Sequence, residues 1–179
     1  MPPNGPAVDR DQIDHFALEI ARSQVLTQLM ARVGFAVWQV AECEDTLAHY
    51  VVIRLRESKG VGEEQGRELL AKHQGRTFGQ LLGDLRKAGI LDPSVEARAS
   101  KLLAERNWLI HDAKRENRGL PNDLERVGAM TERLDWIADE ALALNKILEA
   151  ELEEIVVASG VDRKRIDEEA AKLRQKWGY

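Results

Sequence analysis

A short stretch of the chain combines a strong cation, an amide and an imidazole within six residues. These residues are Arg106, Asn107 and His111, and the side chains between them are apolar. Arginine keeps its charge at physiological pH and its planar guanidinium suits a phosphate, whereas histidine can accept or donate a proton near neutral pH. The three residues predict cleavage of a phosphodiester without a metal ion. Arg106 would stabilise the scissile phosphate, and His111 would serve as general base or acid.

The spacing of these residues decides which of them can act together. Each residue of an α-helix turns about 100°, so Arg106 and His111 point about 140° apart. Asn107 and His111 are four residues apart and share a face, so Asn107 is expected to orient the imidazole or a substrate oxygen. One arginine and one histidine make a sparse site. A two-fold symmetric homodimer brings the same patch of two subunits together and supplies two of each.

The charge of the chain is concentrated around this motif. The 179 residues carry a formal net charge of −5, which argues against a surface that binds nucleic acid everywhere. Between residues 98 and 118, however, six Lys and Arg stand against three Asp and Glu, a net charge of +3. Lys114, Arg115 and Arg118 follow the motif directly and are expected to bind the phosphate backbone of the substrate.

Helical periodicity extends over almost the whole chain. Apolar residues recur every three or four positions from about residue 9 to 55, from 77 to 88, from 93 to the motif, and from 123 to 158. The apolar positions of the first segment are Ile13, Phe16, Ile20, Leu26, Leu29 and Met30. Gly34 either bends this helix or lies within it. We expect an all-α fold, an antiparallel helical bundle of four main helices with short extra helices.

Caps and breakers delimit these helices. Residues 58–62 contain two glycines and predict a break, and so does Gly75. Thr77 is expected to cap a helix that ends at Gly89. Residues 119–122 predict a turn, and residues 162–177 a charged terminal helix. The domain prediction is a leader over residues 1–8, a single helical domain over 9–158 and a C-terminal charged helix over 159–179.

Several features exclude other classes of protein. No hydrophobic run indicates a signal peptide or a membrane span, so the default expectation is a cytoplasmic location without membrane contact. The single cysteine, Cys43, cannot form an internal disulfide and is expected to be buried. No spacing of His or Cys predicts a metal site, and no cofactor motif is present. His15, His49 and His73 are expected at the surface or half-buried.

Acidic and aromatic side chains raise two further candidates. Glu42 and Glu44 lie two residues apart and so face differently on a helix. Glu44 falls on the apolar stripe, and we expect it to point toward the motif, as a salt-bridge partner first and an orienting residue second. Trp38, Trp108 and Trp136 could stack on bases, but their helical spacing favours the core.

The motif and its helical context resemble the HEPN family (higher eukaryote and prokaryote nucleotide-binding domains). The family pattern is an Arg, often a polar residue, and a His after four to six intervening residues, matched here by Arg106, Asn107 and His111. The acidic stretch 38–50 and the segment 77–82 also look like parts of these bundles. The resemblance covers about residues 10–158.

The resemblance implies a metal-independent endoribonuclease that acts as a homodimer and leaves 2′,3′-cyclic phosphate products. Many members are toxins or anti-phage effectors, which implies RNA as substrate and an antitoxin or regulatory protein as partner. One toxin subgroup carries a Tyr directly after the His, which a partner enzyme modifies; Asp112 stands there in this chain. The alternative is a non-catalytic helical module that binds a nucleotide, a nucleic acid or a protein, and a purely structural dimerisation domain is a third possibility.

Overall fold

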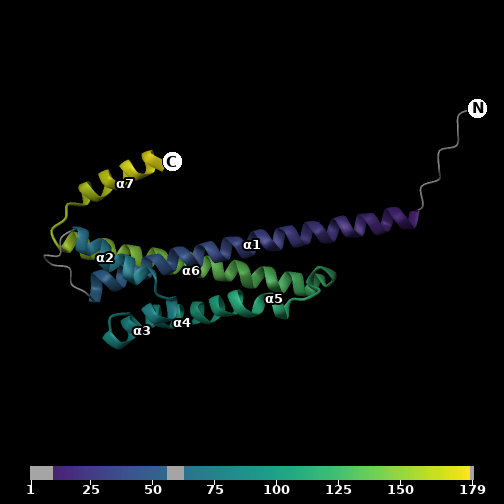
Figure 1. Ribbon diagram of the computed structural model, residues 1–179, viewed down its shortest axis with the longest axis horizontal. Coiled ribbons are helices and arrows are strands. Elements are labelled where there is room, and N and C mark those ends of the chain that lie inside the picture. The colour runs from purple at the N-terminus through teal and green to yellow at the C-terminus, as the bar shows by residue number, and fades with distance from the viewer. Residues whose placement is uncertain (1–9, 56–62, 178–179) are drawn as a thin grey trace, which may run out of the picture. The chain divides into compact units, whose positions relative to one another are not determined.

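The computed structural model describes residues 10–55 and 63–177, which are mostly helical, with short turns between the helices, and contain no strand (Figure 1). The helices are α1 (Arg10–Leu55), α2 (Glu63–Gln74), α3 (Phe78–Ala88), α4 (Pro93–Asn107), α5 (Ala113–Glu116), α6 (Leu124–Ala158) and α7 (Arg163–Trp177). A π-helical turn, η1 (Trp108–Asp112), joins α4 to α5, and a 3₁₀ turn, η2 (Leu120–Asn122), precedes α6. The prediction of an all-α chain is confirmed. The predicted leader over 1–8 and the predicted break at 58–62 lie outside the described residues.

The chain forms two compact units. Unit 1 contains residues within Met1–Ala41 and Lys101–Ala141, and unit 2 contains Glu42–Ser100 and Leu142–Tyr179. Helices α1, α4 and α6 each contribute to both units, because the division falls inside them. The Arg106–His111 stretch belongs to unit 1.

In unit 1, α1 and α6 run in the same direction, and the segment from α4 to α5 runs in the opposite one (Figure 1). An ion pair between Arg32 and Asp135 joins α1 to α6. Glu105 of α4 accepts a hydrogen bond from Arg133 of α6. The apolar core of the unit comes from all of these helices and includes Leu29, Ala36, Val40, Leu102, Leu109, Leu134 and Ile137.

In unit 2, local capping fixes α3 as the sequence predicts. The side chain of Thr77 accepts a hydrogen bond from the backbone of Gln80, whose own side chain accepts one from Thr77. Gly89 ends the helix with φ of 63°, a left-handed conformation that glycine adopts without strain. Phe78, Leu81, Leu82 and Leu85 are buried on one face of α3.

A buried tyrosine explains why one acidic residue, Glu151, stands in the apolar seam of α6. The apolar members of this seam, spaced by three or four residues when Glu151 is included, are Met130, Leu134, Ile137, Ala141, Leu144, Leu148 and Ile155. The hydroxyl of Tyr50 in α1 donates a hydrogen bond of 2.5 Å to Oε2 of Glu151 in α6. Tyr50 is fully buried, and this burial, together with the hydrogen bond to Glu151, raises the pKa of Tyr50 to about 12. Glu151 therefore takes an apolar position because it satisfies a buried phenol.

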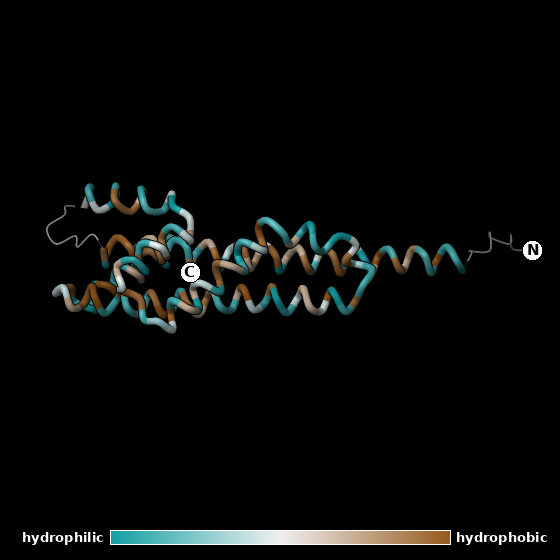
Figure 2. Tube along the Cα trace, turned by 90° about the horizontal axis from the view of Figure 1, so that it is seen from below, coloured by the Kyte–Doolittle hydropathy of each residue, from teal (hydrophilic) through white to brown (hydrophobic). Residues whose placement is uncertain are grey.

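The N-terminal part of α1 is not covered by the rest of unit 1. The helix continues through Gly34 without a break, and every residue from Arg10 to Ala21 is exposed. Apolar positions continue along this uncovered end (Figure 2), and the exposed fractions of Ile13 and Phe16 are 51% and 68%. Of the six apolar positions that the sequence marks in this segment, only Leu29 is buried.

The expectations about single side chains have different outcomes. Trp108 and Cys43 are buried, as predicted, and Trp136 is half-buried. The expectation that Trp38 lies in the core is wrong, because its side chain points to solvent. His73 is buried, contrary to expectation, and its Nδ1 lies 2.8 Å from the carbonyl oxygen of Leu69.

None of the helices within the described residues is long and apolar enough to cross a lipid bilayer.

Replacing Tyr50 by Phe should lower the free energy of unfolding by about 1 to 3 kcal/mol, because Glu151 loses its donor. Urea denaturation at pH 7 measures this difference.

The pH dependence of the two proteins should also differ. The folded wild type keeps its phenol protonated up to a pKa of about 12, whereas the unfolded chain ionises near 10. The contribution of Tyr50 to stability is therefore present below pH 10 and is lost as the pH rises from 10 to 12. The Phe variant should lack this part of the decline, and the same alkaline decline in both proteins would contradict the assignment.

Candidate functional site

The motif lies at a change of helical register. The backbone N–H of Ala113 donates to the carbonyl of Trp108, five residues earlier, where an α-helix would use the residue four earlier. His111 lies inside this π-helical turn. Such turns are rare, and they occur frequently at functional sites. The sequence analysis missed this turn, and neither the residue types nor the apolar spacing marks it.

The wide turn changes the geometry of the motif. Between Arg106 and His111 the chain passes from α4 into η1, so the angle between them is smaller than the 140° of a regular helix, because i→i+5 bonding advances less per residue. Arg106 is half-buried, while Asn107 and His111 are exposed. Nη1 of Arg106 donates a hydrogen bond of 3.4 Å to Oδ1 of Asn107. In the described residues no hydrogen bond joins Asn107 to His111, so Asn107 contacts the cation and not the imidazole.

The basic residues after the motif divide into two groups. Lys114 in α5 and Arg118 in the turn after it line the same groove. Arg115 lies elsewhere, because its Nη2 forms an ion pair of 2.7 Å with Oδ1 of Asp112. The structure therefore brings together two of the three predicted backbone-binding cations.

That groove, here called the α1/η2 groove, is the larger of two cavities beside the motif, with a volume of about 650 Å³. Its lining is largely apolar, with Lys114 and Arg118 as its charged members. The residues that line it are Leu26, Leu29, Met30, Val33, Leu109, Ala113, Lys114, Asn117, Arg118, Gly119, Leu120, Pro121 and Met130. Leu109 and Ala113 face the groove, so His111, which lies midway between them in sequence, points away from it.

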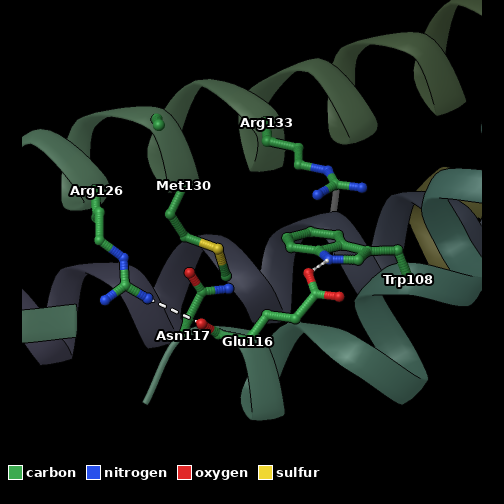
Figure 3. Close-up of a pocket in the computed structure, with 7 residues that line it drawn as sticks. Trp108, Glu116, Asn117, Arg126, Met130 and Arg133 are labelled. Atoms are coloured by element: carbon green, nitrogen blue, oxygen red, sulfur yellow. Dashed lines mark hydrogen bonds between the residues drawn. The ribbon is translucent and has the colours of Figure 1, made fainter. Parts of the chain in front are cut away.

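A second, smaller cavity of about 170 Å³ lies at Trp108. Figure 3 shows the guanidinium of Arg133 over the indole, with Cζ 3.4 Å from the ring centre. The indole Nε1 donates a hydrogen bond of 2.6 Å to Oε2 of Glu116. Arg126 donates to the backbone carbonyl of Glu116 at 2.8 Å (Figure 3). Trp108, at the start of the π-turn, and Glu116, in α5 after it, therefore both contact arginines of α6.

Arg133 also binds a carboxylate on α4. Its Nε donates to Oε2 of Glu105 at 2.5 Å, so one guanidinium joins the residue before Arg106 to the tryptophan that begins η1. The sequence analysis missed Arg126 and Arg133 as neighbours of the motif. Their spacing of seven residues places both on one face of α6. This spacing was the only feature of the sequence that could have indicated a basic face of α6 beside the motif.

Glu44, the predicted orienting residue, lies in unit 2. It is half-buried, and its Oε1 accepts a hydrogen bond of 3.3 Å from the backbone N–H of Phe78, the first residue of α3. A carboxylate at the start of a helix compensates its unpaired N–H groups and its dipole. This contact gives Glu44 a structural role in positioning α3.

The site contains no obvious ligands for a metal ion. Across residues 10–55 and 63–177 no three side chains of His, Cys, Asp or Glu are grouped so that they could hold one.

Comparisons of the chain with protein-family models, with curated proteins and with solved structures gave no match. Function is therefore inferred from the residues of the chain itself.

Arg133 should matter more to stability than Arg126. Replacing Arg133 by Ala removes the ion pair with Glu105 and the cation–π contact with Trp108, and we expect a loss of about 2 kcal/mol in the free energy of unfolding. Arg126→Ala, on the same helix, removes an exposed hydrogen bond to a carbonyl and should cost less than about 1 kcal/mol. Chemical denaturation of both variants makes the comparison, and equal losses would mean that Arg133 does not hold the π-turn.

Proposed function

We propose that this chain is a metal-independent endoribonuclease of the HEPN type, built on an antiparallel helical bundle. Arg106 stabilises the scissile phosphate, and His111 transfers a proton. Asn107 positions the guanidinium of Arg106 or a substrate oxygen. The observation that carries the proposal is the π-helical turn at Trp108–Asp112, which holds an exposed His111 five residues after Arg106.

The chemistry needs no group beyond these side chains and a second histidine. A neutral imidazole takes the proton of a ribose 2′-OH, and the 2′ oxygen attacks the adjacent phosphorus. The P–O5′ bond breaks, and the leaving 5′ oxygen receives a proton from an imidazolium. The products are a 2′,3′-cyclic phosphate and a 5′-hydroxyl. The negative charge that develops on the phosphate oxygens is stabilised by the guanidinium of Arg106.

A symmetric homodimer supplies the second histidine and the second arginine. A two-fold axis near η1 puts the same exposed face of two subunits opposite each other, and the exposure of both Asn107 and His111 is consistent with such a face. Lys114 and Arg118, which line the neighbouring α1/η2 groove, add positive charge that attracts the RNA backbone to this part of the molecule. An antitoxin or regulatory protein that covers the face would restrain the activity.

Substitution of His111 tests the proposal directly. Purified protein is incubated with mixed RNA in EDTA, and RNA ends are analysed for 2′,3′-cyclic phosphates. His111→Gln should lower the cleavage rate by about 10² to 10⁴, the usual contribution of a general acid or base, and Arg106→Ala should lower it comparably. His49→Gln is the matched control in unit 2 and should cleave like the wild type.

The register of the π-turn provides a second test. Ile110 is exposed, and its deletion leaves Trp108 and Ala113 only four residues apart, so their hydrogen bond becomes that of a regular α-helix. We expect circular dichroism to show unchanged helicity while cleavage falls by at least about 100-fold. Full activity after this deletion would remove the π-turn from the mechanism.

The outcomes also separate the two classes of function considered. Cleavage that depends on His111 and persists in EDTA supports the ribonuclease. RNA binding without cleavage in the wild type, unchanged in His111→Gln, would favour a non-catalytic binding module. The π-turn favours the enzyme, since a binding module needs no particular register between Arg106 and His111.

A further inference from the structure

Two apolar features of unit 1 are unexplained by the proposed function. The first is the uncovered end of α1, here called the α1 stripe, formed by Ile13, Phe16 and Ile20, with Ala17 between them. These residues follow one helical face at three- and four-residue spacing. The second is the α1/η2 groove, which lies further along the same helix between α1, η2 and the start of α6. Both expose apolar area that costs free energy in water.

We infer that the α1 stripe of one copy of this chain seats in the α1/η2 groove of a second copy, and the reverse, so that two chains exchange their N-terminal helical ends. A helix that lays its apolar face in an apolar groove is a common mode of recognition. Because each copy carries both the stripe and the groove, the exchange closes into a two-fold symmetric dimer. This inference does not rest on the proposed function: it assigns Lys114 and Arg118 to the helix of the partner copy, whereas the proposed function uses them to attract RNA.

The stripe cannot fill the groove of its own chain. Both features are on α1, which is a continuous helix from Arg10 to Leu55. Leu26, the first groove residue, comes thirteen positions after Ile13, and at 1.5 Å per residue this is roughly 20 Å of unbroken helix. Figures 1 and 2 both show this end of α1 extending past the turn that contains η2. The occupant must therefore come from another molecule.

Charge favours a second copy as the occupant. Residues 10–22 contain Arg10, Asp11, Asp14, Glu19 and Arg22, a net charge of −1, whereas the charged residues of the groove are Lys114 and Arg118. Glu19 forms an ion pair with Arg22 within its own helix, and the exposed Asp14 lies beside the stripe. An acidic apolar helix thus matches a basic apolar groove, which also guides association.

The first measurement is the mass of the full chain by sedimentation equilibrium. We expect twice the chain mass of 20.2 kDa. Phe16→Ser should raise the dimer dissociation constant by about 100-fold or more, because both copies lose an aromatic anchor and truncation of such an anchor typically costs more than tenfold. Phe35→Ser is the matched control, since Phe35 lies on the same helix and is 56% exposed; it should associate like the wild type.

A mixing experiment identifies the groove as the seat of the stripe. The double variant Lys114→Glu/Arg118→Glu reverses the charge of the groove and should be monomeric alone. Mixed with Phe16→Ser, it should form a heterodimer weaker than the wild-type dimer, because one of the two contacts stays intact: the stripe of the groove variant in the groove of Phe16→Ser. Circular dichroism of each variant checks that its helices are retained.

Each other result would overturn the inference. A wild type that stays monomeric up to about 1 mM has no such interface, and the groove is then left to a small amphipathic anion. A groove variant that dimerises like the wild type would mean that stripes pair with each other. Mixed variants that stay monomeric, or equal effects of Phe16→Ser and Phe35→Ser, would exclude the exchange. A monomeric wild type would also contradict the homodimer of the proposed function. The variants separate the two proposals, because Phe16→Ser and the groove variant test the exchange by association, whereas His111→Gln tests the ribonuclease by cleavage.

Discussion

One backbone hydrogen bond, from the N–H of Ala113 to the carbonyl of Trp108, sets the geometry of the motif region. It inserts one extra residue into a helical turn, and this residue changes the direction of every side chain between the two helical segments. The turn is not held by its own backbone alone. Trp108 is clamped between Arg133 and Glu116, and Arg133 also binds Glu105 one turn earlier. The rare register is thus stabilised by interactions with α6.

These contacts separate the functions of neighbouring residues. On one side of η1, Trp108 faces the cavity that Arg126 and Arg133 of α6 also line. On another, Leu109 lines the apolar groove. His111 of the same turn is exposed. Trp108 and Leu109 are therefore fixed by packing, whereas the imidazole is accessible to a ligand. A rigid support under an exposed imidazole is what proton transfer at a defined position requires.

Much of the fold follows from local sequence signals, because these signals act over a few residues. Thr77 and Gly89 delimit α3 through capping and a left-handed glycine, and neither needs tertiary contacts to be recognised. The apolar seam of α6 is equally local. In contrast, the partner of Glu151 could not be predicted, since Tyr50 is a hundred residues away in sequence. Periodicity also identified the apolar positions of the first helix but not whether anything covers them, so Phe16, one of these positions, is exposed, and Trp38 was expected in a core that does not include it. The candidate site was predicted by residue type, whereas its register was not, because a π-turn arises from a balance of contacts and not from a composition.

The clamp around Trp108 has a consequence for spectroscopy. An indole that stacks under a guanidinium and donates to a carboxylate has an emission energy sensitive to the electric field of both charges. Trp38 lies in solvent and Trp136 stacks with Lys101, so their surroundings differ from that of Trp108. Since Trp108 begins the turn that carries His111, its fluorescence is an intrinsic reporter of the register of η1. In a variant that keeps Trp108 and replaces Trp38, Trp136 and Trp177 by Phe, movement of the motif can therefore be followed without a label, on the timescale of a stopped-flow experiment.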